Sequence, residues 1–344
     1  MSSKNSNLHQ AKKNKNDEFY TQLTDIEKEL VHYVDFFEGK TIYCNCDDAR
    51  ESNFFKYFSN RFEELGLKKL IATGYKENGH GVVLVYEGDK NGNRIVDDEE
   101  IQVTELQGDG DFRSDECIEF LKEADVVVTN PPFSLFREYV KQLMDYEKKF
   151  LIIGNMNAIT FKEIFPYIKN NELWLGASIT SGDRAFNVPD DYPLEAATCG
   201  VDNNGKRFIR VKGVRWFTNI DNKKRNTPLD LYKTYTGHEN EYPKYDNYDA
   251  INVDKTSDIP IDYDGVMGVP ITFLDKYCPS QFEIVSFMKG EDGKDLVFTR
   301  ERERESSTVL SYPCSTSIPG MIKNAEGKIN GKITYARITI QRKK

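Results

Sequence analysis

Asn130-Pro131-Pro132-Phe133 is the stretch whose residue types and order could most directly do chemistry. The two prolines lack N–H groups, and the first of them forces Asn130 away from helical geometry. The rigid turn therefore presents two acceptors side by side, the Asn130 side-chain oxygen and the Pro131 carbonyl oxygen. Two fixed acceptors suit a substrate that carries two hydrogens on one nitrogen, which is an amino group.

The chemistry that these acceptors favour is transfer of a group to a weakly nucleophilic amine. The exocyclic amine of adenine is such a group, because its lone pair is delocalised into the ring. Two hydrogen bonds drawn from the NH₂ favour a tetrahedral nitrogen and localise the lone pair for attack, by orientation and electrostatics. Phe133 adds a flat face on which a planar ring can stack.

The tetrapeptide is specific. With average residue usage, Asn-Pro-Pro followed by an aromatic residue arises at roughly 1 position in 10⁵. A plain structural alternative exists, in which the turn only ends a strand and Phe133 fills the core. The apolar run DVVVT before the turn and the helical pattern after it favour the functional interpretation.

The elements that must position this turn alternate between strands and helices. Apolar runs predict strands at 40–46, 68–75, 125–130 and 150–155, and helical spacing predicts helices at 53–66, 115–124 and 134–149. This alternation predicts an α/β fold of the Rossmann-like type, with a mostly parallel sheet flanked by helices. Ligands of such sheets bind beyond the carboxyl ends of the strands, where CNCDDARES, GDGDFRS and NPPFS fall.

We expect three parts along the chain. Residues 1–16 form a flexible basic arm, 17–180 the α/β domain, and 181–344 the end of its sheet plus an irregular recognition region. Within the α/β domain, the runs 82–88 and 94–106 predict a β-hairpin inserted at about 81–107, because Asn91-Gly92 between them is a strong turn signal.

Composition excludes several classes of protein. Hydrophobic residues make up 38% of the chain, and no apolar run reaches the roughly 18 residues of a membrane span. The N-terminus lacks the apolar segment of a signal peptide, so we expect a cytoplasmic protein. Six cysteines without a C-x-x-C pair favour reduced thiols and no metal site. The sequence contains neither G-x-S-x-G nor G-x-x-x-x-G-K-[ST], which leaves a serine nucleophile and nucleotide hydrolysis without support.

Positive charge is clustered although the net charge is −9. The clusters are Lys12, Lys13 and Lys15; Lys206, Arg207, Arg210, Lys212 and Arg215; and Lys223, Lys224 and Arg225. A local patch of one sign can attract phosphates on an acidic protein. The clusters are equally compatible with ordinary solvated faces.

Longer segments resemble the EcoRI-type adenine-N6 DNA methyltransferases. The resemblance is carried by KNDEFYTQ, YCNCDDARESNFFKYF, GDGDFRSDECIEFLKEADVVVTNPPFSLFREYV and DGVMGVPITFLDKY, with NGKITYARI near the end. It implies a domain that binds S-adenosylmethionine (SAM) and transfers its methyl group to N6 of a flipped-out adenine in duplex DNA. It also implies a restriction-modification-type enzyme that needs no membrane or metal and acts as a monomer. Functional pairing with a restriction endonuclease is compatible with it.

The resemblance further implies residue roles. Asn130, Pro131, Pro132 and Phe133 correspond to the catalytic tetrapeptide, and the cofactor residues are Tyr20, Thr21, Cys44, Asn45, Cys46, Asp47, Asp111, Phe112 and Asn130. Phe133 and a second aromatic residue hold the flipped base. Trp216 and Phe217 lie where that second aromatic is placed, and in a strand only one of them points each way. We favour Phe217, with a core role as the alternative. Candidate DNA contacts are Lys12, Lys13, Lys15, Arg215, Lys223, Lys224 and Arg225.

The first strand-to-helix turn departs from the usual glycine-rich pattern. CNCDDARES contains no glycine, although Asn and Asp tolerate left-handed backbone better than most residues. Asp47 and Asp48 are also candidates for a helix N-cap. Glu77 could bind the ribose of SAM, but the hairpin insertion makes its alignment poor.

Two other functions stay open from the sequence. The acceptor amine could belong to cytosine N4, to RNA or to a protein glutamine, since each presents an NH₂ group. The chain could also be a DNA-binding homologue without catalysis, which the intact tetrapeptide argues against.

Overall fold

The computed structural model describes residues 20–46, 48–76, 79–188, 194, 199–202, 205–288 and 327–343. The predicted basic arm at 1–16 lies outside these residues. The chain divides into two compact units: unit 1 is Met1–Ala158 with Leu175–Asn222, and unit 2 is Ile159–Trp174 with Lys223–Lys344. The expected boundary near residue 180 does not coincide with this division, because the chain enters unit 2 briefly and then returns to unit 1.

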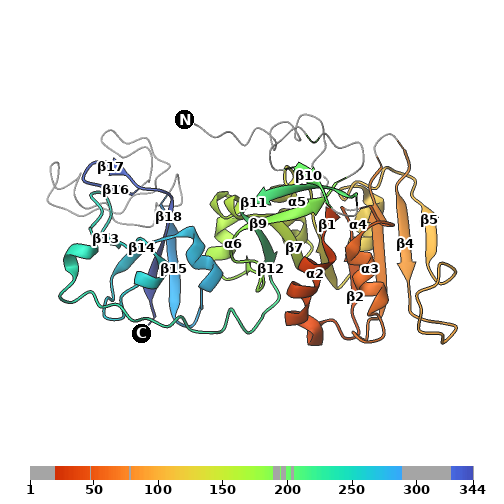
Figure 1. Ribbon diagram of the computed structural model, residues 1–344, viewed down its shortest axis with the longest axis horizontal. Helices are drawn as coiled ribbons and strands as arrows, with labels where there is room; N and C mark the ends of the chain where they lie inside the picture. Colours follow the sequence, from red (N-terminus) through yellow and green to blue (C-terminus); the bar gives the residue numbers. More distant parts are fainter. Residues whose placement is uncertain are drawn as a thin grey trace. The chain divides into compact units, whose positions relative to one another are not determined.

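Unit 1 is built on an eight-stranded sheet with the order β5-β4-β3-β2-β6-β7-β12-β8 (Figure 1). Its centre is parallel: β3 (Lys69–Gly74), β2 (Thr41–Cys44), β6 (Val126–Thr129) and β7 (Lys149–Asn155). The flanking strands are β4 (Val82–Tyr86), β5 (Gln102–Glu105), β12 (Val214–Thr218) and β8 (Trp174–Leu175). β4 runs antiparallel to β3, and β12 antiparallel to β7. The expected α/β architecture with a mostly parallel central sheet is therefore confirmed.

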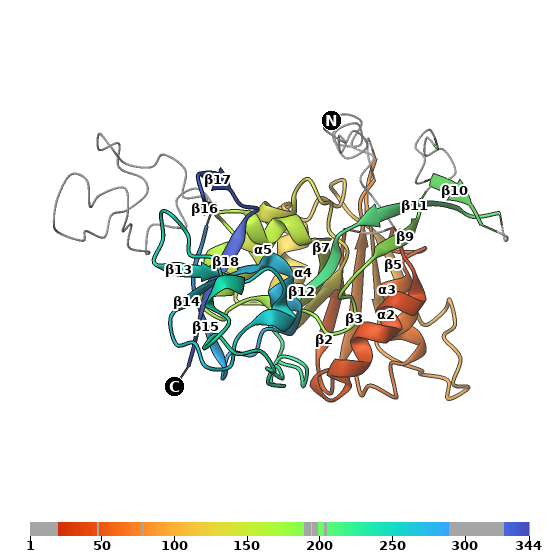
Figure 2. The same cartoon turned by 60° about the vertical axis from the view of Figure 1, so that its left-hand side comes forward.

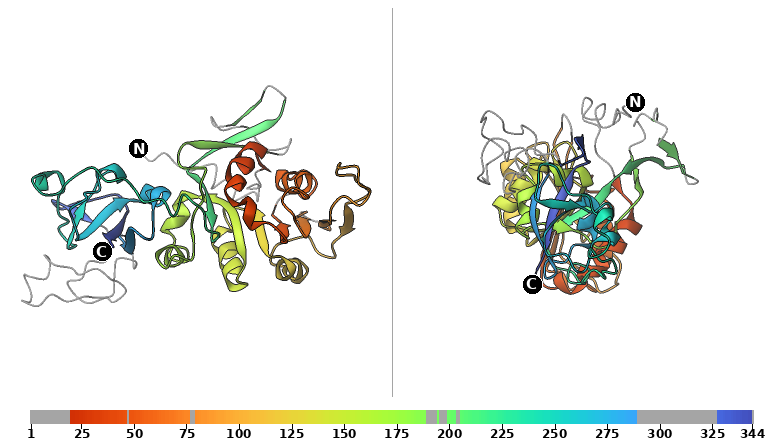
Figure 3. Two further views of the ribbon diagram at one scale, coloured as in Figure 1. Left: turned by 90° about the horizontal axis from the view of Figure 1, so that it is seen from below. Right: turned by 90° about the vertical axis from the view of Figure 1, so that its left-hand side faces the viewer.

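Helices cover both faces of this sheet. The helices of unit 1 are α2 (Leu23–Leu30), η1 (Val31–Phe36), α3 (Asn53–Asn60), α4 (Asp115–Glu123) and α5 (Phe136–Asp145). α2 and α3 lie on one face and α4 and α5 on the other (Figure 3). Ser52 and Ser114 cap α3 and α4, because each hydroxyl accepts a first-turn N–H at 3.2 Å. α3 ends at Asn60, earlier than the expected 66.

The core of unit 1 follows from the composition of its strands. Residues of β2, β6 and β7 such as Ile42, Val127 and Ile152 are completely buried. A parallel sheet with helices on both faces requires such uninterrupted apolar strands. α3 contributes Phe54 and Phe58 to the core on one face of the sheet, together with Ile42 of β2. Full burial of one such side chain contributes about 1.5–3 kcal/mol, so these strands hold the loops at their ends in fixed positions.

The two strands of the expected hairpin are confirmed, but the second strand is shorter than expected. β4 and β5 are antiparallel, with Val82 opposite Glu105, yet the second strand starts only at Gln102. The connecting loop turns around Asp89, whose carboxylate accepts the N–H groups of Gly92 and Arg94, each at 2.6 Å. These backbone donors lower the pKa of Asp89. The carboxylate thus organises residues that the alternating pattern had assigned to a strand.

A second, four-stranded sheet in unit 1 has the order β1-β9-β11-β10. Its strands are β1 (Tyr20–Thr21), β9 (Asp183–Asn187), β11 (Arg207–Lys212) and β10 (Cys199–Val201). All of its pairings are antiparallel. In Figure 2, β10 and the adjoining part of β11 extend away from the eight-stranded sheet as a ribbon.

Unit 2 contains a mixed sheet with the order β13-β14-β18-β15. Its strands are β13 (Ala250–Asn252), β14 (Val266–Pro270), β15 (Phe282–Phe287) and β18 (Arg337–Arg342), with the small pair β16 (Lys328–Ile329) and β17 (Lys332–Ile333). The helical segments are α6 (Phe165–Lys169), η3 (Glu239–Glu241), η4 (Thr256–Asp258) and η5 (Ile271–Lys276), and η2 (Met156–Thr160) leads into the unit. Tyr245, Tyr248 and Met288 form one core cluster here.

Membrane-spanning helices and clustered metal ligands are both absent from the described ranges. The ranges contain no helix that is long and apolar enough to cross a membrane. Nor do these ranges contain a group of three or more His, Cys, Asp or Glu side chains that could hold a metal ion.

Candidate active site

The site lies between two adjacent strands whose following connections lead to opposite sides of the sheet. β2 and β6 are adjacent parallel strands, but β2 leads to β3 on one side and β6 leads to β7 on the other. Such a switch point is where ligands bind in open α/β sheets. The Thr129 hydroxyl at the end of β6 donates a hydrogen bond to the carbonyl oxygen of Asn45 after β2. The loops CNCDDARES, after β2, and NPPFS, after β6, are therefore held together.

The glycine-free turn after β2 obtains its left-handed residue from a cysteine. Cys46 has a φ of +64°. Asp47 lies outside the described residues. Asp48 accepts the N–H groups of Arg50 and Glu51 at 2.9 and 3.3 Å. Asp48 therefore caps the turn itself, whereas the N-cap of the following helix is Ser52.

Tyr139 connects this turn to the loop after β5. The Tyr139 hydroxyl donates to the side-chain oxygen of Asn45, which is 3% exposed. Burial raises the pKa of Tyr139 well above its ordinary value, so the phenol stays a neutral donor. Its ring meets Phe112 edge-on, with centroids 4.9 Å apart. Sequence reasoning missed Tyr139, although it shares the inward face of α5 with Phe136, Val140 and Leu143.

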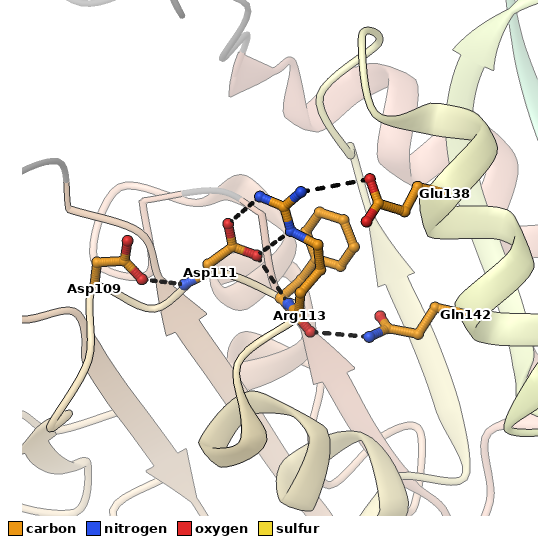
Figure 4. Close-up of polar contacts among 6 residues, drawn as sticks. Asp109, Asp111, Arg113, Glu138 and Gln142 are labelled. Carbon is orange, nitrogen blue, oxygen red and sulfur yellow. Dashed lines mark hydrogen bonds and ion pairs between the residues drawn. The ribbon is translucent and has the colours of Figure 1, made fainter.

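Asp111 and Phe112 are fixed by polar contacts with α5 (Figure 4). Arg113 donates to the Asp111 carboxylate through Nε at 2.8 Å and reaches Glu138 at 3.4 Å. The Asp111 carboxylate raises the pKa of Arg113, so this guanidinium stays charged. Gln142 donates to the Phe112 carbonyl at 3.1 Å. The Asp-Phe pair is therefore positioned independently of any ligand.

Glycine is required at Gly110, in the GDGDF loop. Gly110 has a φ of +85°, and an added Cβ would lie 2.4 Å from the carbonyl oxygen of Gly74 at the end of β3. Lys76 N–H donates to the Asp109 carbonyl at 2.8 Å and closes the same contact. The close backbone approach that glycine permits is thus found in this loop and not in the turn after β2.

The second sheet brings Phe186 to the tetrapeptide, with Thr21 as its neighbour on β1. Asn130 is 5% exposed, and Phe133, which is half-buried, meets Phe186 edge-on with centroids 6.4 Å apart. Phe186 on β9 is paired with Thr21 on β1. The Thr21 hydroxyl oxygen is buried and has no hydrogen-bond partner within the described part of the chain. A polar atom in this position is suited to a ligand that supplies the missing partner.

Glu29 anchors the segment that leads into β9. Its carboxylate is completely buried and accepts the Tyr33 hydroxyl at 2.8 Å and the Ala177 N–H at 2.7 Å. The second oxygen accepts the N–H and the hydroxyl of Ser178 at 2.7 and 2.5 Å. Four donors on one carboxylate compensate its burial. Residues 176–178, and with them the approach to Phe186, are thereby held against α2.

The base-stacking assignment of Phe217 is wrong. Phe217 is 0% exposed, and its ring packs against Phe136 with centroids 5.0 Å apart. Trp216 on the other face of β12 is also 0% exposed and packs against Phe54. Both faces of this strand are covered, so alternation could not identify an open side. The second aromatic residue beside Phe133 is Phe186, which the sequence did not single out.

The assignment of Arg215 to DNA contact is also wrong. Arg215 is 4% exposed and donates to the carbonyl oxygens of Val214 and Thr180 at 2.8 and 2.7 Å. The guanidinium group is bonded to the loop before β9 and cannot reach a phosphate unless that loop unfolds.

The remaining basic candidates differ in their surroundings. In unit 2, the Arg225 guanidinium lies 3.9 Å from the centroid of the Trp174 ring and donates to Asn171 at 3.3 Å. Lys223 is exposed and Lys224 is half-buried. Lys12, Lys13 and Lys15 fall in the part of the chain that is not described, as does Glu77.

Comparison with known proteins adds an independent finding. A family model described as adenine-specific methyltransferase EcoRI matches residues 7–343. The type II methyltransferase M.EcoRI of Escherichia coli is 55% identical over 298 residues, which cover 84% of this chain and 91% of that protein.

Two mycoplasma proteins are also similar. M.MgeORF184P of Mycoplasma genitalium is 42% identical over 280 residues, 81% of this chain and 85% of that protein. M.MpnI of Mycoplasma pneumoniae is 36% identical over 338 residues, 98% of each chain. Both carry the name type II methyltransferase.

Proposed function

We propose that this chain, which belongs to the family of EcoRI-type adenine-specific methyltransferases, is a SAM-dependent DNA methyltransferase. It transfers the methyl group of SAM to N6 of adenine in duplex DNA. One observation carries the proposal. The Asn130 tetrapeptide follows directly on Thr129, which is bonded to Asn45 at the switch point of the sheet. The amine-directed acceptors thus lie beside the place where a cofactor binds in this class of sheet.

The residues around the switch point fit SAM. The Thr21 hydroxyl oxygen, buried and lacking a partner among the described residues, offers a polar contact. The turn at Asn45 and Cys46 and the Asp111-Phe112 pair flank the same strand ends, and Gly110 keeps the second loop close to β3. When bound, SAM supplies an electrophilic methyl group on its sulfonium sulfur. The chain would hold the cofactor through these residues of unit 1.

Asn130 and Pro131 would act on the acceptor amine. Both residues are buried, so hydrogen bonds that they accept are little weakened by water. Hydrogen bonds from both N–H groups of the amine to these acceptors would localise its lone pair for attack on the methyl carbon. The C–S bond of SAM would break as the N–C bond forms, and the nitrogen would release one proton to water. Phe133 would supply the stacking face for the extruded base, and its T-shaped contact with Phe186 would help to hold the Phe133 ring in place.

Duplex DNA is the proposed substrate, because the matching family is adenine-specific and the relatives are named type II methyltransferases. A base inside a duplex must be extruded before its amine can reach Asn130. The same names support a role in restriction-modification. We propose in addition that an endonuclease of matching specificity is the functional counterpart and that a single protomer acts on one strand. Lys223, Lys224 and the lysines at 12, 13 and 15 remain candidate phosphate contacts.

The acceptor can be identified directly. The purified chain is incubated with methyl-tritiated SAM and unmethylated duplex DNA, and the DNA is digested to nucleosides and separated. We expect the label in N6-methyldeoxyadenosine. Label in N4-methyldeoxycytidine, or label only when RNA or protein replaces DNA, would show that another amine is the acceptor. DNA binding without transfer would identify a catalytically silent protein.

A further inference from the structure

The two faces of the second sheet of unit 1 differ in character. Residues paired across neighbouring strands point to the same face. Ile209 is paired with Phe186, which is paired with Thr21, and Val211 lies on the same side. All four side chains are buried, with exposures between 1% and 9%. This inner face contacts the core and brings Phe186 against Phe133.

The opposite face, called here the basic ribbon face, contains no buried residue. Register places on it Tyr20, Asp183, Ala185, Asn187, Gly200, Phe208, Arg210 and Lys212. Arg210 and Lys212 are exposed, and Phe208 is half-buried. The guanidinium of Arg210 lies 5.6 Å from the centroid of the Phe208 ring. Cations interleaved with an aromatic side chain are typical of nucleic-acid-binding surfaces.

Charge favours an anionic partner for this ribbon. The basic ribbon face carries two exposed cations, Arg210 and Lys212, and one acidic side chain, Asp183, in a chain whose net charge is −9. Asp183 lies 3.9 Å from Arg210, but both groups are well exposed, so this pair is worth little and leaves the arginine available. Lys212 extends into solvent on the same face. A positive patch on an acidic protein concentrates phosphates at one place.

Shape favours duplex DNA. The major groove admits a two-stranded antiparallel ribbon, and β10 and β11 form such a ribbon at the end of the sheet (Figure 2). β9 carries Phe186 on its inner face and Ala185 and Asn187 on its outer face. One strand therefore borders the proposed base pocket and the basic ribbon face together.

We propose that the basic ribbon face is a docking surface for the duplex beside the extruded adenine, with Arg210 and Lys212 contacting phosphates. This inference rests on the proposed function, because it assumes that the substrate is duplex DNA. The ribbon then fixes the distance between the bound backbone and the pocket, since β9 is shared by both.

The test compares two double variants of the full chain with equal changes in charge. Arg210→Gln with Lys212→Gln removes the two cations of the face. Lys56→Gln with Lys122→Gln removes two exposed cations elsewhere in unit 1 and serves as the control. The dissociation constant for an unmethylated duplex is measured as a function of salt, together with SAM affinity, KM for DNA and kcat.

We expect the ribbon variant to bind DNA at least about tenfold more weakly than the wild type at low salt. The slope of log K against log salt should be smaller in magnitude by about 2. SAM affinity and kcat at saturating DNA should match the control, with the change confined to KM. The charge-preserving swap Arg210→Lys with Lys212→Arg should restore the affinity.

Equal affinity and slope in the ribbon and control variants, while the wild-type chain still methylates adenine in DNA, would overturn the docking surface alone. A wild-type chain that fails to methylate adenine in DNA would instead overturn the proposed function. The two failures are thus distinguished by the wild-type reaction.

Discussion

The Thr129 hydroxyl donates a hydrogen bond to the main-chain carbonyl of Asn45, and this bond joins the end of β6 to the end of β2. Both residues are buried, and Thr129 directly precedes Asn130. Strand β6 thereby positions the proposed acceptor for the amine, while β2 positions the turn proposed to contact SAM. The Thr129 hydroxyl thus adds to the backbone pairing of β2 with β6 and holds the two loops together at the strand ends.

Replacing Thr129 by Val should remove that hydroxyl with little change in shape. We expect the free energy of unfolding to fall by about 1–3 kcal/mol, because the buried Asn45 carbonyl loses its donor. SAM affinity and the rate of methyl transfer should fall together. Urea unfolding and SAM titration measure both effects. Thr129→Ser keeps the hydroxyl and is the matched control; equal behaviour of the Val and Ser variants would contradict the role of the bond.

Of the two glycines in the GDGDF loop, only Gly110 should be sensitive to replacement by alanine. Gly110→Ala places a Cβ 2.4 Å from the Gly74 carbonyl at a φ of +85°, so the loop must move. We expect lower stability and at least tenfold weaker SAM binding, since 1.4 kcal/mol of strain already corresponds to tenfold. An added Cβ at Gly108 meets nothing within 4 Å, and Gly108→Ala should behave like the wild type. Isothermal titration of SAM separates them.

Phe133 and Phe217 should separate catalysis from stability. Phe217→Leu is expected to lower the free energy of unfolding by on the order of 1 kcal/mol, as core swaps do, with kcat retained below the melting temperature. Phe133→Leu is expected to cost little stability, because the ring is half-buried, and to reduce kcat/KM for DNA. Thermal unfolding and steady-state kinetics on both variants give the comparison. A catalytic defect in Phe217→Leu without loss of stability would restore the role that its burial excludes.

Alkaline pH should destabilise the fold through its buried phenols. Burial raises the pKa of Tyr43 well above its ordinary value near 10, so the folded state keeps the proton that the unfolded state loses. The stability that this group contributes is fully present below pH 10 and declines as pH rises above it. Tyr43→Phe removes one such group and should make the decline shallower by about 1.4 kcal/mol per pH unit. Urea unfolding between pH 8 and 11 tests this, and parallel curves would contradict it.

The parts of the candidate site that lie within one continuous segment could be predicted from the sequence. Asn130 to Phe133 follow a buried strand and precede a helix, and both neighbours can be read from local patterns of apolar residues. The position of the loops at the carboxyl ends of parallel strands follows from the alternation of strands and helices. The second aromatic residue could not be found in this way. Phe186 reaches Phe133 only because β9 pairs with β1, a contact between segments far apart in the chain.

The wrong assignments have physical causes as well. Phe217 lies in a strand that is covered on both faces, where alternation of side chains gives no indication of exposure. Two backbone carbonyls accept hydrogen bonds from the buried guanidinium of Arg215, and a list of basic residues cannot reveal such partners. The left-handed residue of the first turn is Cys46, a residue type with no preference for that conformation, so the chain around it determines its geometry.

The most direct test of the proposed function is the single-turnover rate of Asn130→Ala. At saturating SAM and duplex DNA, we expect formation of N6-methyladenine to slow by on the order of 10²-fold or more, because the amine loses a positioned acceptor. SAM affinity should stay within about twofold of the wild type, a change below about 0.4 kcal/mol. Asn60→Ala, on the exposed side of α3, is the control. Transfer by Asn130→Ala at the wild-type rate would contradict the role assigned to the tetrapeptide.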